Sequence, residues 1–116
     1  MGFSESVTYK KSYSFAIRIV KLYKYLKAEK NEFILSKQLL RSGTAVGALL
    51  REAKFAQSKA DFTNKLSIAL KEANETDYWI DLLYDSDFLD EKMYNSIKKD
   101  IIEIIKLLVS SVKSSK

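Results

Sequence analysis

Apolar residues recur at alternating steps of three and four along most of the chain. This spacing places them on one face of a helix and differs from the strict alternation of a strand. It predicts four helices, over about residues 9–29, 32–56, 59–85 and 90–113. The chain has no proline and only three glycines, and both residue types disfavour helix interiors. Composition and periodicity therefore agree on an all-α protein.

The connections between the predicted helices are only a few residues long, so consecutive helices should run antiparallel. Residues able to cap a helix start stand at three boundaries: Asn31 with Glu32, Ser58 with Asp61, and either Asp87 or Asp90. The sequence shows no linker and no internal repeat. We expect residues 1–116 to form one domain, an up-down-up-down antiparallel four-helix bundle.

Small residues cluster in the second predicted helix. Gly43 and Gly47 are four positions apart and therefore share a helix face. We expect this face to allow close helix packing inside the bundle, while a backbone exposed to a ligand or to RNA is the alternative. A phosphate-binding loop is not indicated, because no Gly-Lys-Ser/Thr sequence follows the glycines.

Two carboxylates interrupt an apolar row on the third predicted helix. Glu72 and Glu75 belong to a row that also contains Trp79, and Arg41 lies level with them if the second and third helices are antiparallel. Carboxylates beside a core need partners. We therefore expect a buried ion pair of Arg41 with Glu75, Glu72 or both. The alternative is that both carboxylates are solvated.

The residue inventory excludes several kinds of chemistry. The chain contains no cysteine and no histidine, so thiolate metal sites and the commonest general base are absent. Glu72 and Glu75 lack the histidines of a di-iron bundle. We expect no enzyme, no catalytic residue, no metal and no cofactor. No apolar run approaches the roughly 18 residues of a membrane span. The expectation is a cytoplasmic protein with no membrane partner.

The fourth predicted helix has an unusually wide apolar arc. Its polar residues occupy a narrow stripe, whereas a helix in a monomeric bundle needs apolar residues over only about a third of its circumference. We expect Ile102, Ile105 and Val109, together with Trp79, to form an oligomer interface. The alternative is a helix that is buried within a single bundle.

Charge is distributed unevenly along the chain. Residues 1–60 hold 12 Lys or Arg against 4 Asp or Glu, and residues 61–116 hold 8 against 11, for a net charge of +5. The first two helices carry a set of basic positions: Arg18, Lys21, Lys24, Lys27, Lys37, Arg51 and Lys54. With tyrosines beside them, these positions suit a nucleic-acid backbone. A solvated helix face is the alternative.

The sequence also resembles a known family. The resemblance is carried by residues 38–89, with "RS" at 41–42, "VG" at 46–47, "EAKFAQSKADF" and "KLSIALKEANETDYW", and by "SYSFAIRIVKLYKYL" before them. These stretches resemble the four-helix bundle family called 23S ribosomal RNA intervening-sequence proteins, which is related to the accessory variability proteins of diversity-generating retroelements.

The resemblance implies an up-down bundle that assembles as a homopentamer, and it brings no established catalytic residue. The related accessory proteins bind a reverse transcriptase and nucleic acid. Two hypotheses follow for this chain. The first is a non-enzymatic oligomer that binds RNA through its basic first and second helices. The second is a structural or adaptor oligomer that binds a protein partner such as a reverse transcriptase.

Overall fold

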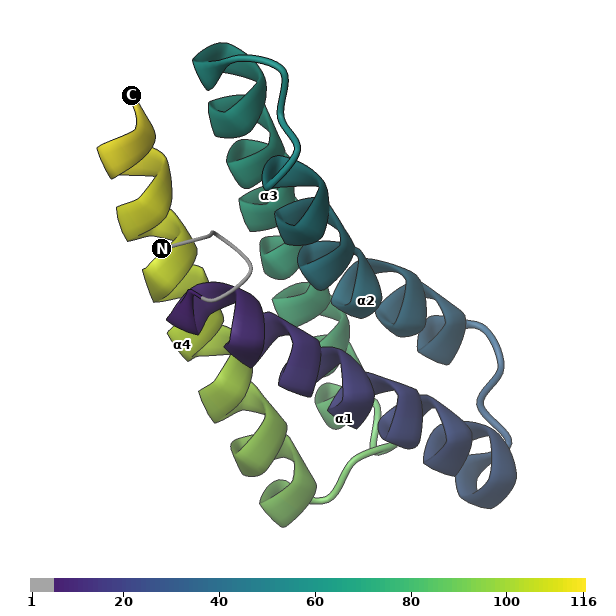
Figure 1. The fold of residues 1–116 in the computed structure, drawn as a ribbon. Coiled ribbons are helices and arrows are strands. Elements are labelled where there is room, and N and C mark those ends of the chain that lie inside the picture. The colour runs from purple at the N-terminus through teal and green to yellow at the C-terminus, as the bar shows by residue number, and fades with distance from the viewer. Residues whose placement is uncertain (1–5) are drawn as a thin grey trace.

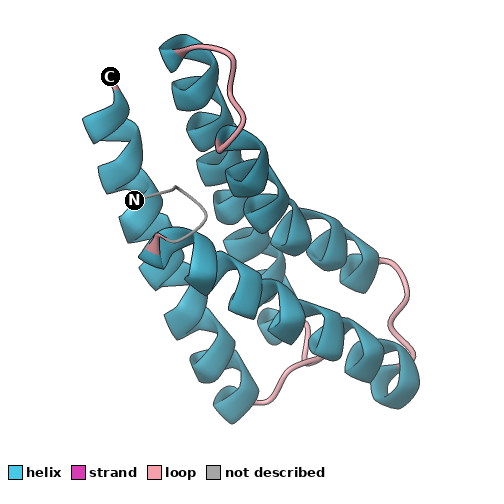
Figure 2. Cartoon of the chain, viewed as in Figure 1, coloured by secondary structure: helices cyan, strands magenta, loops and turns pink. Residues whose placement is uncertain are grey.

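The computed structural model describes residues 6–116 and consists of four helices joined by short loops (Figure 1). The helices are α1 (Val7–Lys30), α2 (Leu35–Ala53), α3 (Lys59–Asp85) and α4 (Glu91–Ser115). Figure 2 shows no strand in the described part of the chain. The predicted all-α four-helix bundle is confirmed.

The helices pack in chain order around an elongated bundle of 44 × 20 × 19 Å. Helix α1 packs on α2 and α4, and α3 packs on the same two helices, while no Cα atoms of the diagonal pairs lie within 8 Å of each other in the described residues. Helix α1 crosses the bundle obliquely, so that its C-terminal half diverges from the N-terminal half of α4 (Figure 1). This divergence positions the groove described below.

The turn between α1 and α2 differs from the prediction that Asn31 and Glu32 begin the second helix. Asn31 ends α1 in the left-handed conformation, with φ 53°, and the N–H of Glu32 donates to the Leu26 carbonyl at 3.0 Å. The Glu32 carboxylate then accepts from the backbone N–H groups of residues 34–36 at 3.3, 3.1 and 2.7 Å. Glu32 thus caps α2 from outside the helix, and α2 begins at Leu35.

The later helix starts follow their capping residues. The Ser58 hydroxyl accepts from the N–H of Asp61 at 3.0 Å, and the Asp61 carboxylate accepts from Gln57 rather than from Ser58. Asp90 caps α4, accepting at 2.8 Å from the N–H three residues later. Asp87, the alternative cap, lies in the loop with φ 68°. Helix α2 ends at residue 53, three residues before the predicted end.

The apolar positions predicted from spacing form the core. Those buried on α1, α3 and α4 include Phe15, Ile19, Leu26, Leu66, Ala69, Ala73, Ile80, Ile97, Ile101, Ile104 and Leu108. On α2, Leu39, Val46 and Leu50 are buried, whereas Leu49 is only partly buried. Inside this core the Thr76 hydroxyl donates to the Ser42 hydroxyl at 2.9 Å. This hydrogen bond joins α3 to α2 and gives both buried hydroxyls a partner.

The two glycines are buried in close helix packing, but their neighbour is α1 and not α3. A Cβ at Gly43 would lie 2.9 Å from both Cγ atoms of Ile19, and a Cβ at Gly47 would lie 3.4 Å from the Ser12 hydroxyl. Both glycines therefore face α1, and neither packs against the acidic side chains of α3. They let the backbone of α2 approach the core face of α1.

Candidate nucleic-acid interface

Four of the basic positions predicted for nucleic acid are exposed lysines. Lys21, Lys24 and Lys27 lie along α1, and Lys37 lies on the first turns of α2. The ammonium of Lys27 lies 4.9 Å from the ring centroid of Tyr23. Lys21 and Lys24 make no hydrogen bond or ion pair with any described residue. These lysines present positive charge to solvent.

Arg18 faces α4 and is engaged in the fold. Its guanidinium pairs with the Asp100 carboxylate, and it donates to the Ser96 hydroxyl at 2.8 Å and to the Ser96 carbonyl at 3.3 Å. The side chains of Arg18 and Asp100 are each 40% exposed. Arg18 therefore ties α1 to α4, and its charge is already shared with a carboxylate.

Arg51 is held by two tyrosines of α1. Its Nε donates to the Tyr9 hydroxyl at 2.7 Å, and its guanidinium lies 5.5 Å and 5.9 Å from the ring centroids of Tyr9 and Tyr13. Lys54 is exposed one turn further on, with its ammonium 5.6 Å from the Phe55 ring centroid. The predicted basic set therefore divides into exposed lysines and two arginines that bridge helices.

Arg41 contacts both carboxylates to which the sequence assigned it. It donates to the two Glu72 oxygens at 3.3 and 3.1 Å and also pairs with Glu75, which accepts from the Trp79 indole at 3.5 Å. The hydrogen bond with Glu72 raises the pKa of Arg41 above its usual value. The description of this pair as buried was wrong, because the Arg41 side chain is 51% exposed and that of Glu72 12%. Arg41 reaches across from the outer side of α2.

Helix α3 also carries acidic residues on the flank that faces α4, and these neutralise Lys98 of α4. The Lys98 ammonium donates to Asp77 at 2.6 Å and to Asp81 at 3.0 Å, and Asp81 also accepts from the Tyr94 hydroxyl at 2.7 Å. Burial lowers the pKa of Lys98, but the bonds to both aspartates outweigh it and leave the pKa raised. The charges on this flank are paired within the fold, in contrast to Lys21 and Lys24 of α1.

The residues predicted for an oligomer interface do not form one patch. Trp79 bonds to Glu75, the partner of Arg41, and therefore lies on the flank of α3 that faces α2. Ile102, Ile105 and Val109 follow Lys98 at steps of four and three, so they lie on the flank of α4 that faces α3. Ile105 packs partly on the core, and Val109 is 36% exposed. Trp79 and the three α4 residues therefore lie on different flanks of one bundle, and the oligomer interface assigned to them stays a prediction.

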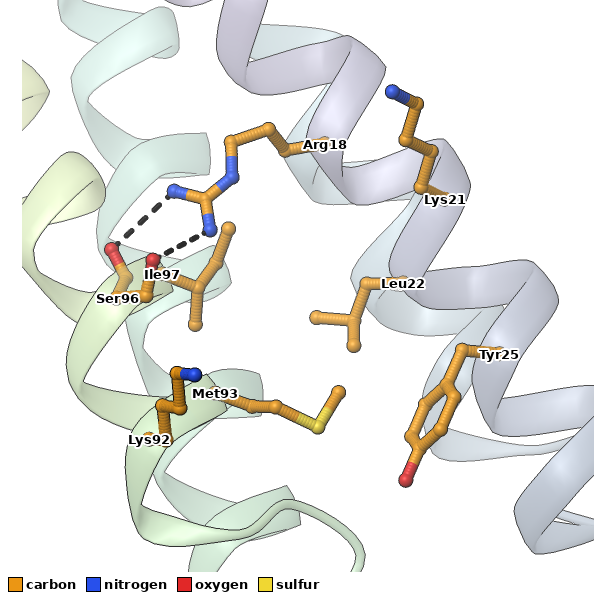
Figure 3. A pocket seen from close by; sticks show the side chains of 8 residues that line it. All are labelled: Arg18, Lys21, Leu22, Tyr25, Lys92, Met93, Ser96 and Ile97. Atoms are coloured by element: carbon orange, nitrogen blue, oxygen red, sulfur yellow. Dashed lines mark hydrogen bonds between the residues drawn. The ribbon is translucent and has the colours of Figure 1, made fainter.

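A groove opens where α1 and α4 diverge (Figure 3). Its volume is about 600 Å³. We call it the α1–α4 groove, and its lining residues are Arg18, Lys21, Leu22, Tyr25, Lys92, Met93, Ser96 and Ile97. Its α4 side was not foreseen, because nothing in the sequence shows that α1 crosses obliquely and leaves this part of α4 uncovered.

A second groove of about 590 Å³ lies between α1 and α2. Its lining is largely apolar, with Gly47 and Ala48 on one side and the exposed rings of Tyr13 and Phe55 beside them. We call it the α1–α2 groove. Phe55 is 75% exposed and Tyr13 53%, so this surface offers aromatic area to a partner.

A metal-binding cluster and a membrane-spanning helix are both absent from residues 6–116. No group of three or more His, Cys, Asp or Glu side chains is placed to hold a metal ion. None of the four helices has the length and apolar character needed to cross a membrane.

The fold and its surface define a class of protein, a four-helix bundle with exposed lysines along one pair of helices. The family model for the 23S rRNA-intervening sequence protein matches residues 4–110, and the chain belongs to this family. A crystal structure from Bacteroides thetaiotaomicron is similar over 97% of this chain and 99% of that one, with 55% identity and a TM-score of 0.92. That structure is of a protein of unknown function from the S23 ribosomal protein family. No curated protein matches the chain.

Proposed function

We propose that this chain is a non-enzymatic, cytoplasmic homo-oligomer that binds RNA through the basic face of α1 and α2. The observation that carries the proposal is the row of exposed lysines Lys21, Lys24 and Lys27, with Lys37 beyond the turn. Lysines aligned on one helix attract phosphates and release counterions when they bind. The name of the family, which refers to ribosomal RNA, is consistent with this partner.

A charge reversal tests the proposal. The double variant Lys21→Glu, Lys24→Glu should bind a generic RNA about tenfold more weakly than the parent protein, with a shallower dependence of log K on log salt. Fluorescence anisotropy at several salt concentrations measures both quantities. The matched control is Lys71→Glu, Lys106→Glu, which reverses two exposed lysines on α3 and α4. Equal weakening by the two double variants, or no RNA binding by the parent, would contradict the proposal.

Self-association is proposed from the apolar surface that one bundle leaves uncovered. Ile102, Ile105 and Val109 of α4 keep part of their surface exposed, and further aromatic area lies in the α1–α2 groove. The resemblance described above implies a pentamer. Sedimentation velocity at micromolar concentration should give one oligomeric species, and a monomer alone would exclude this part of the proposal.

The second candidate function is an adaptor that binds only protein, such as a reverse transcriptase. The α1–α2 groove favours it, because exposed aromatic residues such as Tyr13 and Phe55 are enriched at protein interfaces. This candidate predicts no measurable affinity for RNA at any salt concentration. The anisotropy series therefore separates the two functions.

A further inference from the structure

The α1–α4 groove begins where the polar contacts between these helices end. Within the described chain the ion pairs that join α1 to α4 are Lys11 with Glu103, at 2.7 Å, and Arg18 with Asp100. The α1 residues of both pairs are Arg18 itself or N-terminal to it. Beyond that point no ion pair between described residues joins the two helices, and the groove opens toward the end of α1 (Figures 1 and 3).

The floor of the groove is apolar and built into the core. Leu22 is 9% exposed and Ile97 3%, and Figure 3 shows both directed into the space between the helices. Met93 extends across the floor toward α1, and Tyr25 stands at the open end. Both pack against the core while keeping part of their surface exposed. The floor therefore offers a thioether and an aromatic ring to a flat apolar group.

The rim of the groove is positive. Lys21 on α1 and Lys92 on α4 are exposed, and neither makes a hydrogen bond or ion pair with a described residue. No described carboxylate is among the lining residues. At the inner end, the Arg18 guanidinium is fixed by Ser96 and Asp100. An occupant that combines negative charge with a flat apolar body would complement both the rim and the floor.

An unpaired nucleotide combines negative charge with an accessible flat apolar base, whereas a duplex does not expose the faces of its bases. Bases in a helix are stacked on one another, so a duplex offers only phosphates and groove edges to a shallow protein surface. An unpaired base has a free face that can stack on an aromatic side chain. The groove volume of about 600 Å³ is within the range of sites that hold small ligands.

We propose that the α1–α4 groove holds one unpaired nucleotide of an RNA strand, with its base against Tyr25 and Met93 and its phosphates beside Lys21 and Lys92. The inference rests on the RNA binding proposed above and deepens it, because it makes single-stranded RNA the preferred ligand. It also adds α4 to an interface otherwise confined to α1 and α2. The exposed lysines of α1 attract the strand, and the groove selects its unpaired form.

Comparing the affinities for single-stranded and duplex RNA tests whether the groove selects unpaired nucleotides. A 16-nucleotide single strand should bind the full-length protein about tenfold more tightly than the duplex it forms with its complement. Tyr25→Leu, which keeps an apolar side chain but removes the ring, should weaken single-strand binding about tenfold and leave duplex binding unchanged. Tyr25→Phe should retain the affinity. Lys92→Gln should weaken single-strand binding, while Lys106→Gln, the matched change elsewhere on α4, should not.

A second measurement locates the base directly. The chain has two methionines, Met1 and Met93, so protein labelled on its methionine methyl groups gives a Met93 signal that is assigned by its loss in Met93→Leu. Adenosine monophosphate should shift this signal upfield, because the methyl group lies over the face of the base. Glycerol phosphate, which has no base, should leave it in place.

The outcomes separate this inference from the proposed function. Equal affinity for strand and duplex, with no effect of Tyr25→Leu, would overturn the groove assignment while leaving RNA binding intact. Absence of binding to both forms would overturn both proposals. A Met93 shift caused by laurate or by an acidic peptide, and not by the nucleotide, would show that the groove takes a different anion and would also overturn the inference.

Discussion

Replacing Gly43 with alanine should lower the free energy of unfolding by up to about 2 kcal/mol. The new Cβ would lie 2.9 Å from both Cγ atoms of Ile19, closer than packed carbon atoms allow. Ile19 is fully buried and β-branched, so its side chain has little freedom to move away. Overpacking of this kind costs about 1–3 kcal/mol, and the better helix propensity of alanine offsets about 1 kcal/mol of it.

Gly47 provides the matched control. A Cβ there would meet the Ser12 hydroxyl at 3.4 Å, an ordinary contact. Gly47→Ala should therefore raise the free energy of unfolding by up to about 1 kcal/mol through helix propensity alone. Both variants and the parent are compared by urea unfolding at one protein concentration, since self-association would add a concentration-dependent term. Equal effects at the two glycines would show that α1 and α2 do not approach closely at Gly43.

Replacing Glu32 with alanine should lower the free energy of unfolding by about 2 kcal/mol. Glu32 is 8% exposed, and its carboxylate accepts from three backbone N–H groups at the start of α2, which no other described side chain caps. Alanine would leave these donors without partners beside the core. Thermal or urea unfolding, followed by circular dichroism, measures the loss.

Two variants show whether the effect comes from capping. Glu32→Gln retains one amide oxygen as an acceptor and should lose only about half as much stability. Glu29→Ala removes an exposed glutamate from the last turn of α1 and should change the free energy of unfolding by less than about 0.5 kcal/mol. If Glu29→Ala and Glu32→Ala were equally destabilising, general charge and not capping would explain the result.

The periodicity of the sequence was sufficient to place four helices, but it misplaced both ends of α2. Helix α3 begins at the predicted residue because Ser58 is a strong local signal for a cap, and it also ends at the predicted residue, Asp85. The α1–α2 turn was misplaced, because Asn31 can either begin a helix or end one in the left-handed conformation. Which role it takes depends on Glu32 reaching the N–H groups of the next helix, a contact that spacing does not reveal.

The sequence predicted those features of the candidate site that depend on a single helix, but not those that depend on contacts between helices. The lysines of α1 share an exposed side because a helix repeats every 3.6 residues. The partners of Arg18 and Arg51 lie on other helices, on Asp100 and Tyr9, and depend on crossing angles that the sequence does not specify. The α1–α4 groove depends on the same angles, and on its α1 side only the basic residues Arg18 and Lys21 were predicted from the sequence.

Ultraviolet cross-linking of single-stranded RNA to the assembled protein, with the linked residues mapped by mass spectrometry, tests the central claim most directly. The claim is that RNA binds along the lysine-bearing side of α1. The predicted result is cross-links within residues 21–27, at Tyr23 or Tyr25, that disappear as the salt concentration rises. Cross-links confined to α3 and to the C-terminal half of α4 would contradict it.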